Sequence, residues 1–514
     1  MKLSSLIAVL KTQNSCPTDP DITNLSYDSR RIPPGTLYFA LRGAVTDGHR
    51  FIGQAVAAGA SAVVLEDPGF APPDIPWIMV HDARLALAYM ASVFFGNPTT
   101  GIPVIGITGT NGKTTTTYLI EAILAAAGLP VAVLGTVSYR LGDFELPAPH
   151  TTPESADLQR ILRELVDRGA QGVVMEVSSH ALEQHRADGC SFDVGVFSNL
   201  TPEHLDYHGD MTSYLASKRR LFSELLVPDD RKPLRRAVIN SDDPAGAALV
   251  AAAACPVITY GIENPADVTV RNPVCSVSGI SGVLMTPLGE IPFASEMLGR
   301  FNLYNILAAA AAATALNIDC DAIRSGIEHH RSVPGRMERV HNDLGVTLLV
   351  DYAHTGDALE NVLKTVSALD GQRIITLFGC GGDRDRSKRP VMAEVAGRYS
   401  DLTIITSDNP RTEYPSAIIE EIRAGMLPLR IREYQSGELE AGTVSGKGFV
   451  SVENRRDAIR LAVRLARQGD IVLLAGKGHE DYQIIGTTKH HFDDREEAAA
   501  AFREMSRECL PAQR

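Results

Sequence analysis

Glycines, a lysine and threonines gather in one short stretch, G-I-T-G-T-N-G-K-T-T-T-T, which spans residues 106–117. It follows an apolar run and leads into a helical pattern over residues 118–127. Glycines let backbone N–H groups close around phosphates, Lys113 can neutralise a terminal phosphate, and Thr114 can bind Mg²⁺ at the start of a helix. A strict G-x-x-x-x-G-K-[ST] loop would need glycine where this chain has Ile107. The stretch therefore predicts a variant loop that binds a nucleoside triphosphate, with an ordinary glycine-rich turn as the alternative.

Residues that can bind a metal follow this loop. Glu176 closes an apolar strand pattern, and a carboxylate at a strand end beside a phosphate loop suits Mg²⁺ or its water. His204, Asp206 and His208 come one strand later. A lone histidine is usually structural, and here a metal or phosphate role for His204 is about equally favoured. Lys218 lies in the helical pattern after His204 and by itself has the character of a solvated lysine.

Four apolar strand patterns in the last third of the chain each end in a polar cluster: D-Y-A-H, G-C-G-G-D-R-D, S-D-N-P-R-T-E and A-G-K-G-H-E. Ligands bind outside the carboxyl ends of strands in open parallel sheets. Arg384 and Arg411 lie just past two of these ends, and arginine offers a planar fork for carboxylates. With Asp408 and Glu480 they predict a pocket with both signs of charge, which fits an amino acid. A nucleotide in one domain and an amino acid in another indicate ATP-driven amide or ester formation.

Composition and charge exclude several classes of protein. The formal net charge of −13 disfavours a nucleic-acid partner held by a general basic surface. Seven scattered cysteines without a C-x-x-C pair indicate a reduced, cytoplasmic protein. The N-terminal M-K-L-S-S-L-I-A-V-L predicts an amphipathic helix rather than a signal peptide, and the Ala-rich run over residues 306–316 is too short to span a membrane.

A chain of 514 residues is too long for one hydrophobic core, and its pattern divides into three blocks, 1–98, 99–331 and 332–514. Short apolar strand patterns alternate with helical stretches, which is typical of an α/β fold with mostly parallel sheets. The predicted strands are 36–41, 61–65, 77–80, 131–134, 172–177, 194–198, 237–240, 257–260, 346–350, 374–378, 402–406 and 471–474. Antiparallel strands are predicted at about 266–293 and a helix at about 302–316. We therefore expect a small N-terminal α/β domain, a central P-loop-type ATPase domain and a C-terminal Rossmann-like domain.

The motifs together resemble the Mur ligase family over nearly the whole chain. G-T-N-G-K-T, M-E-V-S-S-H, N-L-T-P-E-H-L-D-Y-H, P-G-R-M-E, D-Y-A-H, G-D-R-D, D-N-P-R-T-E and G-K-G-H-E occur in the family's order, with G-R-F-N-L-Y-N at residues 299–305. The resemblance implies an ATP- and Mg²⁺-dependent acid–amino-acid ligase of peptidoglycan precursor synthesis. This ligase would act through an acyl phosphate to add meso-2,6-diaminopimelate to UDP-N-acetylmuramoyl-L-alanyl-D-glutamate. It would be a monomer without nucleic-acid partners.

The resemblance also implies roles for individual residues. The catalytic set is Lys113, Glu176, His204 and Lys218, with Lys218 carbamylated. The nucleotide contacts are Gly109, Thr110, Asn111, Gly112, Lys113, Thr114, Thr115, Asn302 and Asn305. The metal-associated residues are Thr114, Glu176, His204 and Lys218. The contacts to the UDP-linked substrate are Tyr27, Ser29, Ala44, Val45, Thr46, His150, Thr151, Thr152, Ser178, Gln184 and Arg186. The diaminopimelate contacts are Arg384, Asp408, Asn409, Pro410, Arg411, Gly476 and Glu480.

Two positions depart from the family's pattern, and two alternative functions stay open. His150 stands where relatives usually have asparagine, and Gly356 replaces a common proline. One alternative is a sister ligase that adds L-lysine or extends folate with glutamate. The Y-D-S-R segment at residues 27–30 argues against folate, and Arg411 argues against lysine, which has no second carboxylate for it. The other alternative is a P-loop ATPase without ligase activity.

Overall fold

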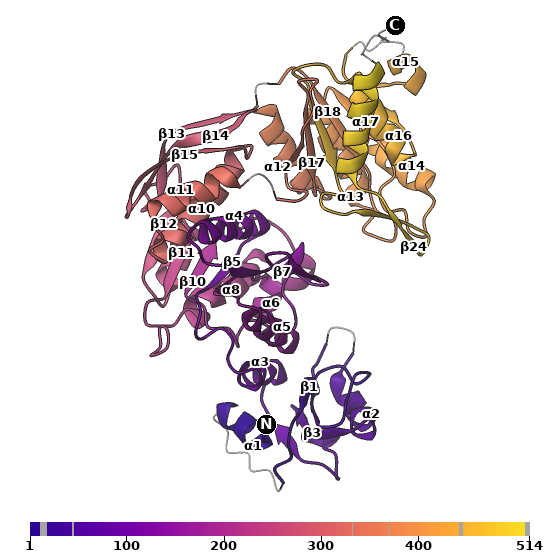
Figure 1. Cartoon of the computed structure of the whole chain (residues 1–514). Coiled ribbons are helices and arrows are strands. Elements are labelled where there is room, and N and C mark those ends of the chain that lie inside the picture. The colour runs from indigo at the N-terminus through magenta and orange to yellow at the C-terminus, as the bar shows by residue number, and fades with distance from the viewer. Residues whose placement is uncertain (11–17, 44–45, 331–332, 370, 441–445, 509–514) are drawn as a thin grey trace. The chain divides into compact units, whose positions relative to one another are not determined.

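The computed structural model describes residues 1–10, 18–43, 46–330, 333–369, 371–440 and 446–508 (Figure 1). The chain divides into two compact units. The first comprises Met1–Arg271, Val283–Pro292 and Tyr304–Ile327, and the second comprises Asn272–Gly282, Phe293–Leu303 and Glu328–Arg514. The first unit contains both the N-terminal block and most of the central block, so the three domain boundaries stay a prediction.

A small parallel sheet occupies the N-terminal part of the first unit, with its strands in sequence order. The strands are β1 (Asn24–Ser26), β2 (Thr36–Phe39), β3 (Ala60–Leu65) and β4 (Trp77–Met79). The helices of this part are α1 (Leu3–Ile7), α2 (Ile52–Ala57) and α3 (Ala83–Phe94). Alternate residues of β2 and β3 enter two separate buried clusters, one on each face of the sheet. The three predicted strands are confirmed, whereas β1 is too short for a sequence pattern to indicate it.

The central sheet has eight strands in the order β12-β11-β10-β5-β9-β6-β7-β8. They are β12 (Val257–Tyr260), β11 (Arg236–Asn240), β10 (Val194–Phe197), β5 (Val104–Thr108), β9 (Gly172–Glu176), β6 (Val131–Leu134), β7 (Ser138–Leu141) and β8 (Phe144–Pro147). The first six are parallel and almost entirely apolar, because helices cover both faces of such a sheet. The last two pair antiparallel at the edge and were not predicted.

Between residues 113 and 329 the described chain also forms eight α-helices and a three-stranded sheet. The helices are α4 (Lys113–Ala126), α5 (Ser155–Asp167), α6 (Ser179–Glu183), α7 (Leu205–His208), α8 (Met211–Arg220), α9 (Gly246–Ala252), α10 (Arg300–Ala315) and α11 (Cys320–His329). The strands are β13 (Thr269–Ser276), β14 (Gly279–Thr286) and β15 (Gly289–Ser295), which confirms the predicted antiparallel segment. The helix predicted at about 302–316 is confirmed as α10, which is buried along most of its length.

The second unit contains a seven-stranded sheet in the order β16-β17-β22-β18-β19-β21-β20. Its strands are β16 (Glu338–Val340), β17 (Thr347–Asp351), β22 (Ile471–Ala475), β18 (Ile374–Phe378), β19 (Leu402–Ile405), β21 (Gly448–Ser451) and β20 (Arg432–Glu433). All neighbours are parallel except β16, which pairs antiparallel with β17. The four predicted strands are therefore confirmed and their carboxyl ends meet at one edge of the sheet.

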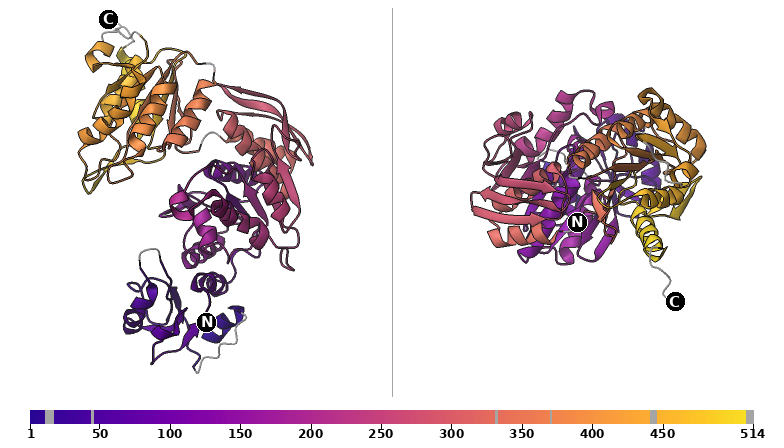
Figure 2. Two further views of the ribbon diagram at one scale, coloured as in Figure 1. Left: turned by 180° about the vertical axis from the view of Figure 1, so that it is seen from behind. Right: turned by 90° about the horizontal axis from the view of Figure 1, so that it is seen from above.

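Helices cover both faces of this sheet, and Figure 2 shows them from two further directions. α12 (Gly356–Ser367), α13 (Lys388–Tyr399) and α14 (Pro415–Met426) contribute to one buried cluster. α15 (Ser436–Glu440), α16 (Arg455–Leu465) and α17 (Asp494–Glu508) contribute to the other. The hairpin of β23 (Tyr482–Ile485) and β24 (Thr488–His491) follows β22 and was not predicted. None of the described helices is long and apolar enough to cross a membrane.

A fully buried ion pair joins α16 to α17. Arg455 donates through Nε and Nη2 to the two carboxylate oxygens of Asp494, at 2.7 and 2.5 Å, and both side chains are 0% exposed. Nη2 also donates to the carbonyl of Ala475 at the end of β22. Removing one partner of such a pair leaves an uncompensated buried charge.

Asp494→Asn should therefore lower the free energy of unfolding of the second unit by about 3–5 kcal/mol. Urea unfolding followed by circular dichroism measures this change. The matched control is Glu497→Gln, which breaks the half-exposed pair with Arg456 between the same two helices and should cost no more than about 1 kcal/mol. Equal effects of the two substitutions would contradict the role of burial.

Candidate functional site

The predicted phosphate loop connects β5 to α4 at the middle of the central sheet. Gly109 and Gly112 have φ angles of +144° and +87°. A Cβ atom on Gly109 would lie 1.9 Å from the hydroxyl of Ser198, and one on Gly112 would lie 2.4 Å from the amide oxygen of Asn305. These two positions therefore require glycine both for backbone conformation and for space.

The end of the neighbouring strand β10 holds the loop in place. Thr110 N–H donates to the carbonyl of Asn199 at 2.8 Å, and Asn111 N–H donates to the Asn199 side chain at 2.9 Å. The Ser198 hydroxyl donates to the carbonyl of Asn111 at 2.6 Å. Asn199 lies in the N-L-T-P-E-H-L-D-Y-H motif, but no role was predicted for it or for Ser198, because their contact with the loop depends on the order of the strands.

Lys113 begins α4 and folds back over the loop. Its ammonium group donates to the carbonyls of Gly109 and Thr110, at 2.9 and 2.8 Å. Thr114 and Thr115 are buried in the first turn of the helix. A cation, a glycine loop and the N-terminus of a 14-residue helix thus lie together, and this set fits a triphosphate with its Mg²⁺.

Lys218 is buried, with 1% of its surface exposed, so the interpretation of a solvated lysine is wrong. Its Nζ donates to the carbonyl of Gly109 at 2.8 Å and lies 4.3 Å from the ring centre of Tyr214. Burial, together with the nearby charge of Lys113, holds the pKa of Lys218 well below its usual value. The neutral form of this amine is therefore easier to reach than in an exposed lysine, and the neutral form is the one that reacts with carbon dioxide.

Glu176 lies beside the loop, since it pairs in register with Ile107 of β5. The buried carboxylate accepts hydrogen bonds from the backbone N–H and hydroxyl of Thr136, at 2.9 and 3.0 Å. His204 is exposed, with a left-handed φ of 56°, and its ring lies 4.8 Å from that of His180. In the described part of the chain, no three His, Cys, Asp or Glu side chains form a group that could hold a metal.

A second group of predicted residues surrounds the end of β9. The hydroxyl of Thr152 donates to the carbonyl of Glu176 and accepts from the N–H of Ser178, at 2.9 and 3.2 Å. Arg186 donates to the side-chain oxygen of Gln184 at 2.6 Å and to the carbonyl of Thr152 at 3.1 Å. The structure therefore brings these residues together although the sequence separates them by up to 34 positions.

Tyr27 joins this group from the N-terminal sheet. Its hydroxyl donates to Asp157 at 2.7 Å, and burial beside that carboxylate raises the pKa of the phenol. Ser29 donates to Gln54, and Thr46 is exposed. The remaining predicted contacts in this loop, Ala44 and Val45, lie outside the described residues.

His150 and Thr151 lie next to the same group. The carbonyl of His150 accepts a hydrogen bond from the hydroxyl of Tyr139, while its side chain is exposed. Thr151 shares a hydrogen bond of 3.1 Å with Thr136, which also contacts Glu176. The contact to Tyr139 uses the backbone of residue 150, so it does not depend on histidine in place of asparagine.

The predicted amino-acid pocket lies at the carboxyl edge of the second sheet. Asp408 and Glu480 are close enough that burial and the Asp408 charge raise the pKa of Glu480. The amide of Asn409 donates to Glu480 at 2.9 Å. A Cβ on Gly476, whose φ is +111°, would lie 3.7 Å from Asp408, so this glycine brings its backbone close to the carboxylates.

The two predicted arginines lie on the loops that follow β18 and β19. Arg411 is half-buried, has a φ of +50°, and donates to the carbonyl of Gly382 at 2.8 Å. Arg384 is exposed, and its guanidinium donates to the carbonyl of Asp383 at 3.3 Å. Gly381 lies between the two side chains. A Cβ atom at this position would lie 2.9 Å from the Arg411 guanidinium and 3.8 Å from the Arg384 side chain.

No site role was predicted for Lys477 or Arg336. Lys477 is fully buried, and its ammonium group lies 3.5 Å from Asp408 and 3.4 Å from Glu480. Arg336 lies 5.1 Å from the ring centre of Tyr352. Both occur in quoted motifs, G-K-G-H-E and P-G-R-M-E, so their place in a motif was the available signal.

The two predicted asparagines near the nucleotide differ. Asn305 accepts a hydrogen bond from Thr116 at 3.4 Å and faces Gly112 of the loop. The side chain of Asn302 donates to the carbonyl of Leu298, four residues earlier in the chain, at 2.8 Å. The contact of Asn305 with the loop supports its assignment, while that of Asn302 stays a prediction.

Comparison with protein families finds three matching domains along the chain. The Mur ligase family catalytic domain matches residues 21–95, the Mur ligase middle domain residues 107–313, and the Mur ligase glutamate ligase domain residues 335–478. The chain is 66% identical over 486 residues to the UDP-N-acetylmuramoyl-L-alanyl-D-glutamate–2,6-diaminopimelate ligase of Geobacter metallireducens, covering 95% of each chain. It is 46% identical to the ligase of the same name from Geobacillus kaustophilus, covering 95% of this chain and 96% of the relative.

Solved structures give a consistent result. A structure of UDP-N-acetylmuramoyl-L-alanyl-D-glutamate–2,6-diaminopimelate ligase matches with a TM-score of 0.72 and 32% identity, over 98% of this chain and 99% of that one. The MurF ligase of Thermotoga maritima in complex with ADP matches with a TM-score of 0.58 and 18% identity, over 95% of this chain and 98% of that one. The second match shows a shared fold alone.

Lys113→Ala should weaken ATP binding roughly tenfold to a hundredfold, because a charge-assisted contact to phosphate contributes about 1.5–3 kcal/mol. Isothermal titration with ATP and Mg²⁺ measures the change. The thermal unfolding midpoint should stay near that of the parent, since the lysine lies over the loop rather than in the core. The control Arg163→Ala removes an exposed cation on α5 and should bind ATP normally. Parent-like ATP affinity in Lys113→Ala would rule out this loop as the phosphate site.

Proposed function

Because the chain belongs to the Mur ligase family, we propose that it adds meso-2,6-diaminopimelate to UDP-N-acetylmuramoyl-L-alanyl-D-glutamate, with ATP as the energy source. The observation that carries this proposal is the 66% identity to a 2,6-diaminopimelate ligase over 95% of both chains. The pocket formed by Arg384, Arg411, Asp408 and Glu480 supports it. The product is a precursor of peptidoglycan. The monomeric state and cytoplasmic location stay predictions.

The reaction forms an amide at the expense of ATP. The D-glutamyl carboxylate attacks the γ-phosphorus, ADP leaves, and an amine of diaminopimelate then attacks the acyl phosphate with loss of phosphate and a proton. The protein provides no nucleophile. Lys113 and the loop N–H groups would hold the phosphates in line and neutralise their charge, which is where most catalysis of phosphoryl transfer arises.

Mg²⁺ would neutralise charge on the transferring phosphoryl group. The residues that would hold it are Thr114, Glu176, His204 and Lys218. As an unmodified amine, Lys218 is a poor ligand for this hard cation, which prefers oxygen. Reaction of its neutral amine with carbon dioxide gives a carbamate, which supplies an anionic oxygen at a buried position.

The cluster of Thr151, Thr152, Ser178, Gln184 and Arg186 would bind the UDP-linked dipeptide. Their hydroxyl, amide and guanidinium groups converge beside Glu176 within one unit. Tyr27 reaches the same region from the N-terminal sheet through Asp157. This arrangement would place the substrate's D-glutamyl end toward the phosphate loop.

Lys218→Ala should lose most of its ligase activity, and a short carboxylate such as acetate should restore part of it by refilling the missing ligand position. NMR with isotope-labelled bicarbonate should detect a carbamate signal in the parent that is absent from Lys218→Ala. A fully active enzyme with no carbamate signal would show that the amine acts unmodified.

The parent enzyme should prefer meso-diaminopimelate to L-lysine by on the order of a thousandfold in kcat/KM, because lysine leaves the arginines without a carboxylate partner. Arg411→Ala should raise the KM for diaminopimelate steeply and leave the KM for ATP nearly unchanged. Phosphate release with each amino acid, in the presence of the UDP-dipeptide, measures these constants.

The same assay separates the alternatives. Equal use of L-lysine and diaminopimelate would contradict the assignment of the pocket. Phosphate release that needs neither the dipeptide nor an amino acid would favour an ATPase without ligase activity. The control Arg423→Ala removes an arginine on α14 that pairs with Glu433, and should leave both KM values unchanged.

A further inference from the structure

One buried arginine lies beneath the two loops that carry Arg384 and Arg411. Arg389 is on the first turn of α13, and its side chain is 0% exposed. Its Nη1 donates to Glu413 at 3.0 Å and to Glu421 at 2.7 Å. Its Nη2 donates to the other oxygen of Glu413 at 2.8 Å and to the carbonyl of Gly381 at 3.2 Å. One planar group therefore satisfies four acceptors from three segments.

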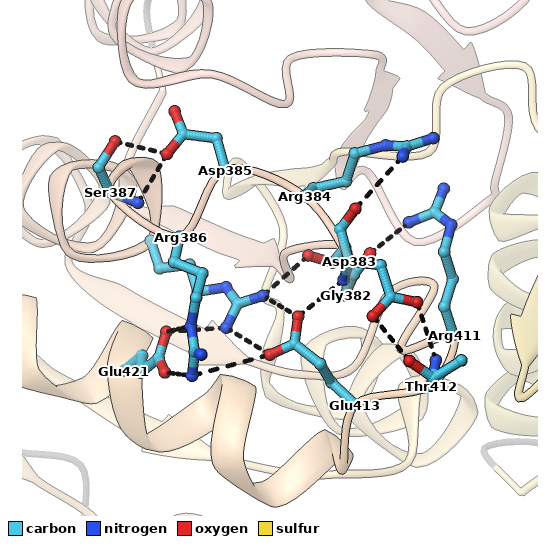
Figure 3. Close-up of polar contacts among 12 residues, drawn as sticks. Gly382, Asp383, Arg384, Asp385, Arg386, Ser387, Arg411, Thr412, Glu413 and Glu421 are labelled. Atoms are coloured by element: carbon cyan, nitrogen blue, oxygen red, sulfur yellow. Dashed lines mark hydrogen bonds and ion pairs between the residues drawn. The ribbon is translucent and has the colours of Figure 1, made fainter.

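Glu413 links the two loops directly. It follows Arg411 by two residues, and its carboxylate also accepts the backbone N–H of Asp383 at 2.7 Å. In return, the carboxylate of Asp383 accepts the N–H and hydroxyl of Thr412, at 3.1 and 2.8 Å. Figure 3 shows this reciprocal pair between the G-D-R-D and D-N-P-R-T-E loops. The loops are thus connected by charge-assisted hydrogen bonds that run in both directions between them.

The backbones of the two loops lie in direct contact. Gly382 N–H donates to the carbonyl of Asn409 at 2.9 Å, and a Cβ on Gly382 would lie 1.9 Å from the carbonyl of Pro410. On its other side, Arg411 pairs with the β23–β24 hairpin through the carbonyl of Ile484 and the N–H of Gly486. Arg411 is therefore held at a strained φ of +50° by partners on two sides.

The carboxylate of Glu413 in this ion pair stays ionised at neutral pH. Arg389, with the N–H of Asp383, lowers the pKa of Glu413 to about 2, so the carboxylate stays ionised throughout any neutral assay. Glu421 has a second partner in Arg386, whose guanidinium also donates to it. Arg386 also lies 3.8 Å from Glu413, but it is exposed and precedes α13, whereas Arg389 is buried and links the loops to that helix.

We infer that Arg389 and Glu413 form a positioning pair that fixes the spacing of Arg384 and Arg411 and so sets the selectivity for an amino acid with a second carboxylate. The inference rests on the proposed function, because it concerns the same pocket. Neither residue of the pair is placed to touch the substrate. They act through the loops, by holding the guanidinium groups of Arg384 and Arg411 in place.

The test is Arg389→Lys. Lysine keeps the charge, but its single ammonium has three donors and no planar fork, so it cannot serve both oxygens of Glu413 together with Glu421 and Gly381. Relaxation of the loops should raise the KM for meso-diaminopimelate roughly ten- to a hundredfold, as misplacement of a binding group by about 1 Å does. The KM values for ATP and the UDP-dipeptide and the kcat at saturation should change little. The preference for diaminopimelate over L-lysine should fall by a similar factor.

Two further variants make the outcome decisive. Glu413→Gln keeps the shape of the pair and should show the same selective loss, whereas Arg398→Lys, on an exposed residue of the same helix, should show none. A loss of thermal stability with unchanged KM for diaminopimelate would show that the pair is structural only and would overturn the inference. A parent enzyme that does not ligate diaminopimelate would instead overturn the proposed function.

Discussion

Two lysine ammonium groups meet at one carbonyl oxygen, that of Gly109, and the rest of the nucleotide site depends on this convergence. Lys113 reaches it from the first turn of α4, and Lys218 reaches it from the buried face of α8. Two positive charges in a poorly solvated place are unfavourable, so the site favours either a neutral Lys218 or an added anion. Triphosphate, and a carbamate on Lys218, would each relieve this repulsion. The same repulsion therefore favours both ligand binding and modification.

The phosphate loop can keep the two lysine ammonium groups in place because contacts with other segments fix its backbone conformation. Ser198 and Asn199, which follow β10, hold the loop from one side, and Asn305 of α10 lies against Gly112. Preorganised donors cost little rearrangement when phosphate binds, and this is the main source of electrostatic catalysis in such sites. The conformation of the loop is thus set by residues far away in the sequence.

The pocket of the second unit contains charges of both signs. It combines Asp408 and Glu480 with Lys477, and sets Arg384 and Arg411 beside them. Arg389, which is buried beneath the supporting loops, gives Glu413 and Glu421 an ionic partner of their own. In the proposed arrangement Arg384 and Arg411 would contact the ligand, whereas Arg389 and Glu413 would act only through the loops.

The sequence determined much of this protein. Glycine and apolar patterns located the strands and the phosphate loop, because backbone conformation and burial act on residues close in the chain. The motifs also indicated the reaction type, since Lys113 follows the loop and Arg384 and Arg411 follow strand ends. Edge elements such as β1, the β7–β8 hairpin and the β23–β24 hairpin were not found, because their residues are short, polar or half-exposed.

Only the tertiary structure decided the environment of each side chain. Lys218 has the sequence context of an exposed residue, yet α8 packs it against Gly109 and Tyr214, and burial changes its chemistry. Arg389 resembles any arginine at a helix start, and only the order of β18 and β19 in the sheet brings it to Glu413. Burial and charge pairing depend on neighbours in space, and no periodicity along the chain records which strands will be neighbours.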